Sequence, residues 1–328
     1  MKTRNLWMLA MLLPFLSCNQ ASKDPMPSWN QTPIKESIVK FVSEYAKAIP
    51  VEDRIAVFDM DGTIACETPL WFEMYAAVYG LNLQSKKDPK LMKYPEYRYA
   101  WKLQENPADT SVLNHYGPYI DSMVWKAYTG IDNEVYIDTA RSYLTRTQAP
   151  KYDMKIADMF YQPMLELLKY LKDNNFTIYI VSGSTQGCIW SVCPQTIGFD
   201  RAHQIGTRQT QIPVYDPASK KTMFVLQKGI SLPKNDGNGK SLNIYSTIGK
   251  VPIFAFGNTT GDFGMFHLTS TSKYPHVEYL LNHDDAEREY AYPPYHGTPV
   301  PGWQDSLKAN NWNQVNMAEE FKTVWKEK

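Results

Sequence analysis

The sequence predicts an α/β protein in which a doubly wound parallel sheet is interrupted by an inserted helical domain. Short apolar runs alternate with helical patterns along most of the chain, which is typical of sheets whose strands are buried on both faces. The alternation stops between residues 66 and 161, where Trp and Tyr are frequent, the apolar spacing is helical and no convincing strand occurs. A chain of 328 residues that is 43% apolar is ample for such a core.

Residues 1–18 have the layout of an export signal peptide. Lys2 and Arg4 precede an apolar stretch from Leu6 to Leu16, which is too short to span a bilayer, and Ser17-Cys18 closes it. This position of Cys18 resembles a bacterial lipoprotein signal, in which the cysteine carries the lipid and becomes the mature N-terminus. The alternative is an incidental cysteine in a signal that is discarded whole. We therefore expect an exported protein of the periplasm or cell envelope.

A linker and the first strand follow the signal. Residues 19–33 are polar with several prolines, which predicts a tether. From Ile34 to Ile49 apolar residues recur at helical spacing. The apolar run Arg54–Phe58 shows no alternation, so it predicts a strand buried on both faces, and it ends at Asp59.

The remaining elements of the predicted sheet lie after residue 161. Each strand is a short apolar run, and each helix has one apolar face or a clear end signal. The predicted elements are a helix from Pro163 to Asn174, strands at Phe176–Val181, Val251–Phe256 and His276–Leu281, and a helix from Lys240 to Ile248 that ends at Gly249.

These elements divide the chain into two parts beyond the linker. Residues 34–65 and 162–328 form the predicted sheet domain, and residues 66–161 form the helical domain inserted after its first strand. A second insertion is predicted between about residues 209 and 238, where the β-like runs QIPVYD and TMFVLQ flank a turn.

The charge balance excludes one class of partner. Thirty-four basic residues offset thirty-four acidic ones, so bulk charge does not attract the chain to nucleic acid or to an anionic membrane. Any contact with a membrane is expected through the N-terminal lipid alone.

Cys66, Cys188 and Cys193 are expected to be small buried residues rather than disulfide partners.

Polar residues follow three of the predicted strands. The first strand leads into Asp59–Thr63, the second into Ser182–Ser184, and the third into Asn258–Asp262. Lys240 begins the helix that precedes this last strand. Because ligands of open α/β sheets bind beyond the carboxyl ends of the strands, we expect these residues to form one site.

This set of residues suits phosphoryl transfer. Asp59 can attack phosphorus and form an acyl-phosphate, and Asp61 can protonate the leaving alcohol and then activate water. Ser182 can donate to a phosphate oxygen, and Lys240 can neutralise charge, although Lys228 is a rival lysine.

A metal ion would reduce the repulsion between a carboxylate nucleophile and a phosphate dianion. Mg²⁺ takes oxygen ligands and keeps several waters. The expected ligands are Asp59, the backbone carbonyl of Asp61, Asp262 and Asn258.

The motifs DMDGT, SGS and GNTTGD, in this order and with the intervening lysine, resemble those of the haloacid dehalogenase superfamily. The resemblance implies a Rossmann-like core, Mg²⁺ as cofactor, and a helical cap that selects the substrate. Asp61 favours the phosphatase and mutase branches, which need an acid/base two residues after the nucleophile. Asn258 is a departure, because many relatives place an aspartate there.

Within the superfamily, the chain is most similar to exported phosphoserine phosphatase-like acid phosphatases and to phosphorylcholine phosphatase. The segment LNHDDAEREYAY at 281–292 also resembles the first group. The resemblance implies a phosphomonoesterase acting on small phosphate esters. A phosphomutase or phosphotransferase of the same superfamily and a non-catalytic lipoprotein that binds a phosphate ligand remain alternatives.

Substrate contacts are expected from the phosphate-binding loop and from the cap. The expected residues are Gly183 and Ser184 in the loop, and Glu67 and Trp71 at the start of the cap. Several cap aromatics could form a cage for a quaternary ammonium group. Aromatics in a small helical domain more often form its core, which is the interpretation we favour.

Overall fold

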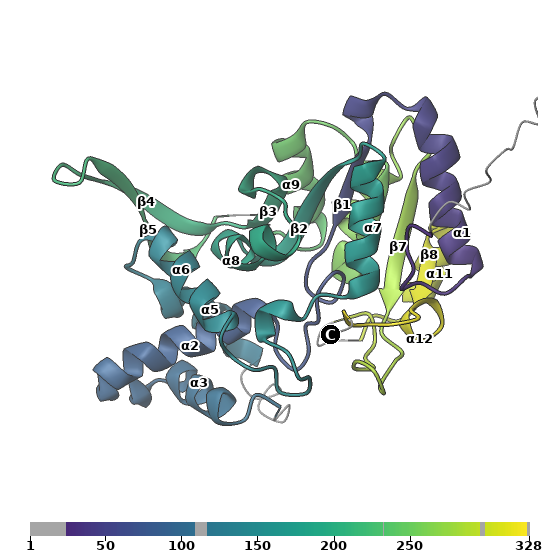
Figure 1. The fold of residues 1–328 in the computed structure, drawn as a ribbon. Helices are drawn as coiled ribbons and strands as arrows, with labels where there is room; N and C mark the ends of the chain where they lie inside the picture. The colour runs from purple at the N-terminus through teal and green to yellow at the C-terminus, as the bar shows by residue number, and fades with distance from the viewer. Residues whose placement is uncertain (1–23, 109–116, 232, 296–298, 327–328) are drawn as a thin grey trace, which may run out of the picture.

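The computed structural model describes residues 24–108, 117–231, 233–295 and 299–326. Its centre is a six-stranded sheet in the order β3-β2-β1-β6-β7-β8, in which every neighbouring pair is parallel (Figure 1). The strands are β1 (Ile55–Phe58), β2 (Thr177–Thr185), β3 (Gln204–Thr207), β6 (Phe254–Gly257), β7 (Val277–Asn282) and β8 (Asn313–Asn316). The predicted doubly wound α/β fold is confirmed.

Helices cover both faces of the sheet, which explains why the central strands are apolar throughout. Val57 of β1 belongs to a core cluster with Ile244 and Phe266, whereas Phe58 belongs to a second cluster with Met164. The core helices are α1 (Pro33–Lys40), α7 (Gln162–Asp173), α8 (Gln186–Thr196), α9 (Asn238–Ile248), α10 (Phe263–Thr269), α11 (Trp303–Asn310) and α12 (Met317–Glu320).

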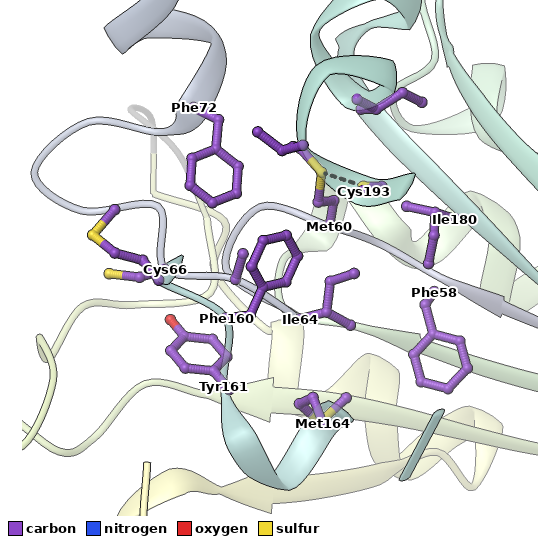
Figure 2. Packing of buried hydrophobic residues seen from close by; sticks show 14 of the residues in the cluster. Phe58, Met60, Ile64, Cys66, Phe72, Phe160, Tyr161, Met164, Ile180 and Cys193 are labelled. Atoms are coloured by element: carbon purple, nitrogen blue, oxygen red, sulfur yellow. Dashed lines mark hydrogen bonds between the residues drawn. The ribbon is translucent and has the colours of Figure 1, made fainter. Parts of the chain in front are cut away.

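The larger cluster runs from the sheet into the base of the inserted domain. Figure 2 shows Phe58 and Ile64 of the first strand and its loop packed beside Phe160 and Met164, with Phe72 of the cap above them. Met60 lies against the thiol of Cys193, 3.4 Å away. The loop that carries Asp59 and Asp61 is therefore anchored by the buried apolar side chains of Phe58, Met60 and Ile64.

The inserted domain is helical, as predicted. It contains α2 (Phe72–Lys87), α3 (Pro95–Glu105), α5 (Ile120–Tyr128) and α6 (Asn133–Leu144). Most of its aromatic side chains form its own core: Phe72, Tyr75, Tyr97 and Tyr128 are buried, and Trp101 is half-exposed. These four side chains are core residues, as the interpretation we favoured expects.

The second insertion is an antiparallel hairpin of β4 (Gln209–Asp216) and β5 (Lys221–Ile230), which projects from the body of the protein (Figure 1). The hairpin joins the cap through main-chain hydrogen bonds. The amide of Gly130 donates to the carbonyl of Leu226 over 2.8 Å, and the amide of Leu226 donates to Ile131 over 2.9 Å. The predicted β-like runs are thus confirmed.

Three expectations need correction. The tether predicted at residues 19–33 is shorter, because Met26 and Trp29 are fully buried against the core and Trp29 packs edge-on against Phe321. The helix predicted over 34–49 breaks after Lys40 into a π-helical turn and a 3₁₀ turn. Strands β3 and β8 were not predicted, because QIGT and NQVN carry little apolar character.

Other expectations agree with the structure or fall outside it. Cys66, Cys188 and Cys193 are buried and free. Cys18 and the predicted signal peptide lie outside the described residues. In the part of the chain that the structure describes, no helix is long and apolar enough to cross a membrane.

Candidate active site

Asp59 lies at the carboxyl end of β1, in the middle of the sheet. Its amide donates to the carbonyl of Phe256 over 2.9 Å, which extends the pairing of β1 with β6 by one residue. The residue is only 6% exposed, and Oδ2 accepts a hydrogen bond from the Thr63 hydroxyl over 3.3 Å. The strand therefore presents a buried carboxylate at the sheet edge where ligands of such folds bind.

Lys240 neutralises this carboxylate. It sits in the first turn of α9, and its Nζ lies 2.5 Å from Asp59 Oδ1 and 2.6 Å from Asp262 Oδ1. Burial raises the pKa of Asp59 well above its ordinary value, and the Lys240 charge opposes that shift. Burial lowers the pKa of Lys240, but the two carboxylates outweigh it and hold that pKa above its ordinary value. Lys228, the rival lysine, is exposed on β5.

Asp61 lies on the opposite side of the loop, against the second predicted motif. Its Oδ2 accepts hydrogen bonds from the hydroxyls of Ser182 over 3.2 Å and Ser184 over 2.7 Å. Both serines belong to β2, whose register against β3 shifts between Val181 and Thr185. Asp61 is only half-buried, so the structure gives the two carboxylates different surroundings.

The third motif contributes Asn258 and Asp262. The amide oxygen of Asn258 accepts from the Thr63 hydroxyl over 3.2 Å, and its Nδ2 donates to Glu67 Oε1 over 2.8 Å. Asp262 Oδ2 accepts from the amides of Asn258 and Thr259, while Oδ1 holds Lys240. Both oxygens of Asp262 thus have protein partners, and Oδ1, which has a single partner, keeps a lone pair; ligation of a metal by Asp262 stays a prediction.

The oxygen atoms of the site fit a Mg²⁺ ion. Asp59 Oδ2 and Asn258 Oδ1 both lie within 3.3 Å of the Thr63 hydroxyl, so the two oxygens converge. With the backbone carbonyl of Asp61 they would form an all-oxygen set of the kind Mg²⁺ prefers. Among the described residues, no group of three or more His, Cys, Asp and Glu side chains could hold a metal, so an ion here depends on amide and carbonyl oxygens.

His283 and Glu289 support the nucleophile loop from behind. His283 Nε2 donates to the carbonyl of Gly62 over 2.7 Å, and Nδ1 lies 3.2 Å from Glu289 Oε2. Glu289 Oε1 also accepts from the thiol of Cys66 and the hydroxyl of Tyr161, each over 2.9 Å. The segment after β7 is thereby tied to Gly62 and to Cys66, which both follow the nucleophile in the sequence.

This support comes from His283 and Glu289 of the segment LNHDDAEREYAY. The two aspartates of the segment, Asp284 and Asp285, make other contacts. Asp284 accepts from the amide of Ala318, and Asp285 pairs with Arg288 in a turn. Residues 286–288, which follow Asp285, form a turn. The resemblance of the segment was the signal that could have found His283.

Glu73 is a second buried carboxylate that sequence analysis missed. It lies in the first turn of α2, and its Oε1 accepts from the amide of Thr185 over 2.7 Å, at the start of α8. The cap thus contacts the core one residue beyond Ser184. In the sequence, Glu73 is one acidic residue in a helical pattern, with no local signal of this contact.

A family model now identifies the chain. The model for haloacid dehalogenase-like hydrolases matches residues 54–224, more than half of the sequence. The chain belongs to this family.

Solved structures agree with this fold, although the chain has no match among curated proteins. A conserved protein of unknown function from Anaerococcus prevotii DSM 20548 has a TM-score of 0.54 at 15% identity, covering 86% of this chain and 91% of that one. A protein of unknown function from Bordetella pertussis Tohama I has a TM-score of 0.48 at 13% identity, covering 80% of this chain and 97% of that one. A phosphoserine phosphohydrolase-like protein from Francisella tularensis subsp. tularensis SCHU S4 has a TM-score of 0.40 at 11% identity, covering 81% of this chain and 97% of that one. At 15% identity, the likeness to the Anaerococcus prevotii protein shows the fold alone.

In this haloacid dehalogenase-like hydrolase, the predicted motif residues meet at one edge of the sheet. Gly183 lies in β2 between Ser182 and Ser184, and its carbonyl accepts from the Thr207 hydroxyl over 2.7 Å. Glu67 is buried beside Asn258, and burial raises the pKa of Glu67 to about 8. Trp71 precedes α2 and packs, partly buried, against the larger core cluster. Substrate contact by Gly183, Ser184, Glu67 and Trp71 stays a prediction.

The pKa of Glu73 predicts a pH dependence of stability in this hydrolase. Burial raises that pKa from 4.5 to about 7, against the opposing effect of the Thr185 hydrogen bonds. The charged and titratable groups that face Glu73 are Asp61, Lys234, Tyr136 and Cys188. Because the folded state holds this proton more tightly than the unfolded chain, the stabilisation is present below the unfolded pKa and is lost as pH rises through the folded pKa.

Glu73→Gln removes this titration. The free energy of unfolding of the variant, relative to that of the wild type, should therefore increase by up to about 3 kcal/mol between about pH 5 and about pH 8. Urea unfolding at the two pH values measures this change. An equal difference between variant and wild type at both values would contradict the assignment.

Proposed function

We propose that this protein is a Mg²⁺-dependent phosphomonoesterase that forms a phospho-aspartate on Asp59. One observation carries the proposal. A buried carboxylate paired with Lys240 stands 2 positions before a half-buried carboxylate that two serine hydroxyls hold. These are the two roles that hydrolysis through an acyl-phosphate requires: a nucleophile whose charge is balanced, and an acid/base near the leaving group.

In the first step, a carboxylate oxygen of Asp59 attacks phosphorus and the ester P–O bond breaks. Protonated Asp61 gives its proton to the leaving oxygen, which departs as an alcohol. Lys240 balances the charge of Asp59, and Ser182 lies where its hydroxyl can turn from Asp61 to a phosphate oxygen. When bound, Mg²⁺ shields the negative charges of phosphate and carboxylate.

In the second step, water attacks phosphorus and the bond to Asp59 breaks. Asp61, now ionised, accepts the proton of this water, so that inorganic phosphate leaves and both carboxyl groups return to their starting states. The contacts of Asp61 with Ser182 and Ser184 keep it on the face of the loop that both steps use.

The substrate is proposed to be a small phosphate ester, with phosphocholine, phosphoethanolamine, phosphoserine and nucleotides as candidates. A cap inserted directly after the nucleophile loop supports a substrate small enough to be enclosed, since the cap reaches the core at Thr185 through Glu73. The two alternatives are a phosphomutase or phosphotransferase and a binding lipoprotein. A phosphomutase needs a second phosphate ester as acceptor. The binding lipoprotein has no use for Asp61 as an acid/base.

The test is phosphate release from a panel of these monoesters, with Mg²⁺ and with a chelator. We expect Mg²⁺-dependent release for at least one ester and loss of release with the chelator. Equal release with the chelator would overturn the Mg²⁺ requirement. No release from any ester by folded, metal-bound protein would overturn the phosphatase proposal in favour of the mutase or binding function.

We also propose that the protein is exported and anchored to a membrane by lipid on Cys18. The support is the sequence of residues 1–18 alone. Radiolabelled lipid in the membrane fraction should disappear in Cys18→Ala; labelling that persists would contradict the anchor.

A further inference from the structure

The orientation of the Asn258 amide is set by the buried carboxyl group of Glu67. An asparagine side chain has an accepting end and a donating end, and turning it over exchanges them. Here Nδ2 donates to Glu67 Oε1 over 2.8 Å, and Oδ1 faces Thr63 and Asp59. With the amide turned over, its oxygen would face Glu67 Oε1, the atom that now accepts from Nδ2, and its NH₂ group would face the site. Glu67 therefore selects the orientation in which oxygen points toward Asp59.

The Asn258–Glu67 pair packs directly against the nucleophile loop. Gly62 has φ +76°, and a Cβ added there would lie 1.9 Å from Asn258 Nδ2 and 2.4 Å from Glu67 Oε1. Asn258 is 1% exposed and Glu67 is 9% exposed, so water does not compete for these contacts. The loop that carries Asp59 and Asp61 thus closes over the amide that Glu67 holds.

A carboxylate at position 258 would need no such partner. Both ends of an aspartate side chain are acceptors, so either orientation presents an oxygen to a cation. The amide is different, because only one of its two ends can ligate a metal. An asparagine at this position therefore requires a buried acceptor next to its NH₂ group.

We propose that Glu67 is a positioning residue that makes Asn258 a Mg²⁺ ligand by fixing its amide oxygen toward Asp59. This inference rests on the proposed Mg²⁺-dependent function. It gives Glu67 a role through Asn258 and not through direct contact with the metal.

The test is Mg²⁺ affinity, measured by isothermal titration calorimetry on chelator-treated protein. Glu67→Met keeps the length of the side chain and removes the acceptor. It should weaken Mg²⁺ binding by about 10–100-fold, the usual effect of losing a residue that orients a metal ligand. Glu67→Gln retains a carbonyl acceptor and should lose less. Glu73→Met is the matched control, because it removes a buried carboxylate of the same segment that does not touch Asn258, and it should leave the affinity unchanged.

The decisive comparison repeats Glu67→Met in an Asn258→Asp background. There the substitution should cause no loss of Mg²⁺ affinity, because the carboxylate needs no orientation. Equal losses in both backgrounds would overturn the proposal and indicate that Glu67 ligates the metal itself or acts by its charge. No loss with Asn258 in place would overturn it as well. Thermal unfolding of each variant confirms that folded protein is compared.

These failures differ from failure of the proposed function. If the function is wrong, the wild type itself binds no Mg²⁺ or releases no phosphate. If only the positioning role is wrong, the wild type binds Mg²⁺ and releases phosphate, and the Glu67 variants depart from the expected pattern.

Discussion

Asp59→Asn should lower the rate of phosphate release by at least about a thousand-fold, because an amide cannot replace a carboxylate as the nucleophile. The substitution keeps the shape of the side chain and leaves an oxygen that can accept from Lys240 or Thr63. The loss is therefore expected in kcat, with the fold intact. Steady-state phosphate release and thermal unfolding of the same preparation measure both.

The size of the loss distinguishes two mechanisms. If Asp59 attacks phosphorus, its replacement removes the reaction path and only a trace of turnover remains. If Asp59 merely held a metal that activates water, raising the Mg²⁺ concentration would restore a substantial part of the rate. Recovery of activity at high Mg²⁺ would contradict the nucleophile assignment.

Asp61→Asn should lower kcat by about a hundred- to ten-thousand-fold for alkyl phosphate esters, the usual contribution of a general acid/base. Its neighbours Ser182 and Ser184 donate to Oδ2, and an amide oxygen can still accept one of these bonds, so the loop should remain in place. The variant loses the proton that an alkoxide leaving group needs.

An aryl ester separates the two roles of Asp61. A nitrophenolate leaves without protonation, so the first step should be nearly normal in Asp61→Asn and the second step, attack by water, should limit the rate. The rapid release of one equivalent of nitrophenol, followed by slow turnover, is the expected result. Equal losses for aryl and alkyl esters, without this burst, would contradict the assignment of Asp61 as the acid.

Much of the fold could be predicted from apolar runs in the sequence. β1 and β6 are buried at every position, so a run such as IAVF is unambiguous, and β2 and β7 contain the apolar runs IYIV and YLL. β8 lies at an edge of the sheet and β3 at the other, and neither carries such a run. Their pairing depends on neighbours that are distant in the sequence, which no local pattern encodes.

In the candidate site, too, residues at strand ends could be predicted, whereas contacts between distant segments could not. Asp59, Ser182 and Asn258 were predicted to lie together because parallel strands place their carboxyl ends at one edge. Glu73 and His283 escaped prediction because each acts through a single backbone group, Thr185 N or Gly62 O, that lies far away in the sequence. The burial of Trp29 was missed for the same reason: its indole donates to the carbonyl of Pro163, 134 residues away.

The central claim, a covalent phosphate on Asp59, is tested most directly by acid-quenching Asp61→Asn during turnover of nitrophenyl phosphate and analysing its peptides by mass spectrometry. The account predicts one added phosphoryl group on the peptide that contains Asp59, absent when Asp59 is also replaced by Asn. A burst of nitrophenol without any phosphorylated peptide, or a phosphoryl group on another residue, would contradict it.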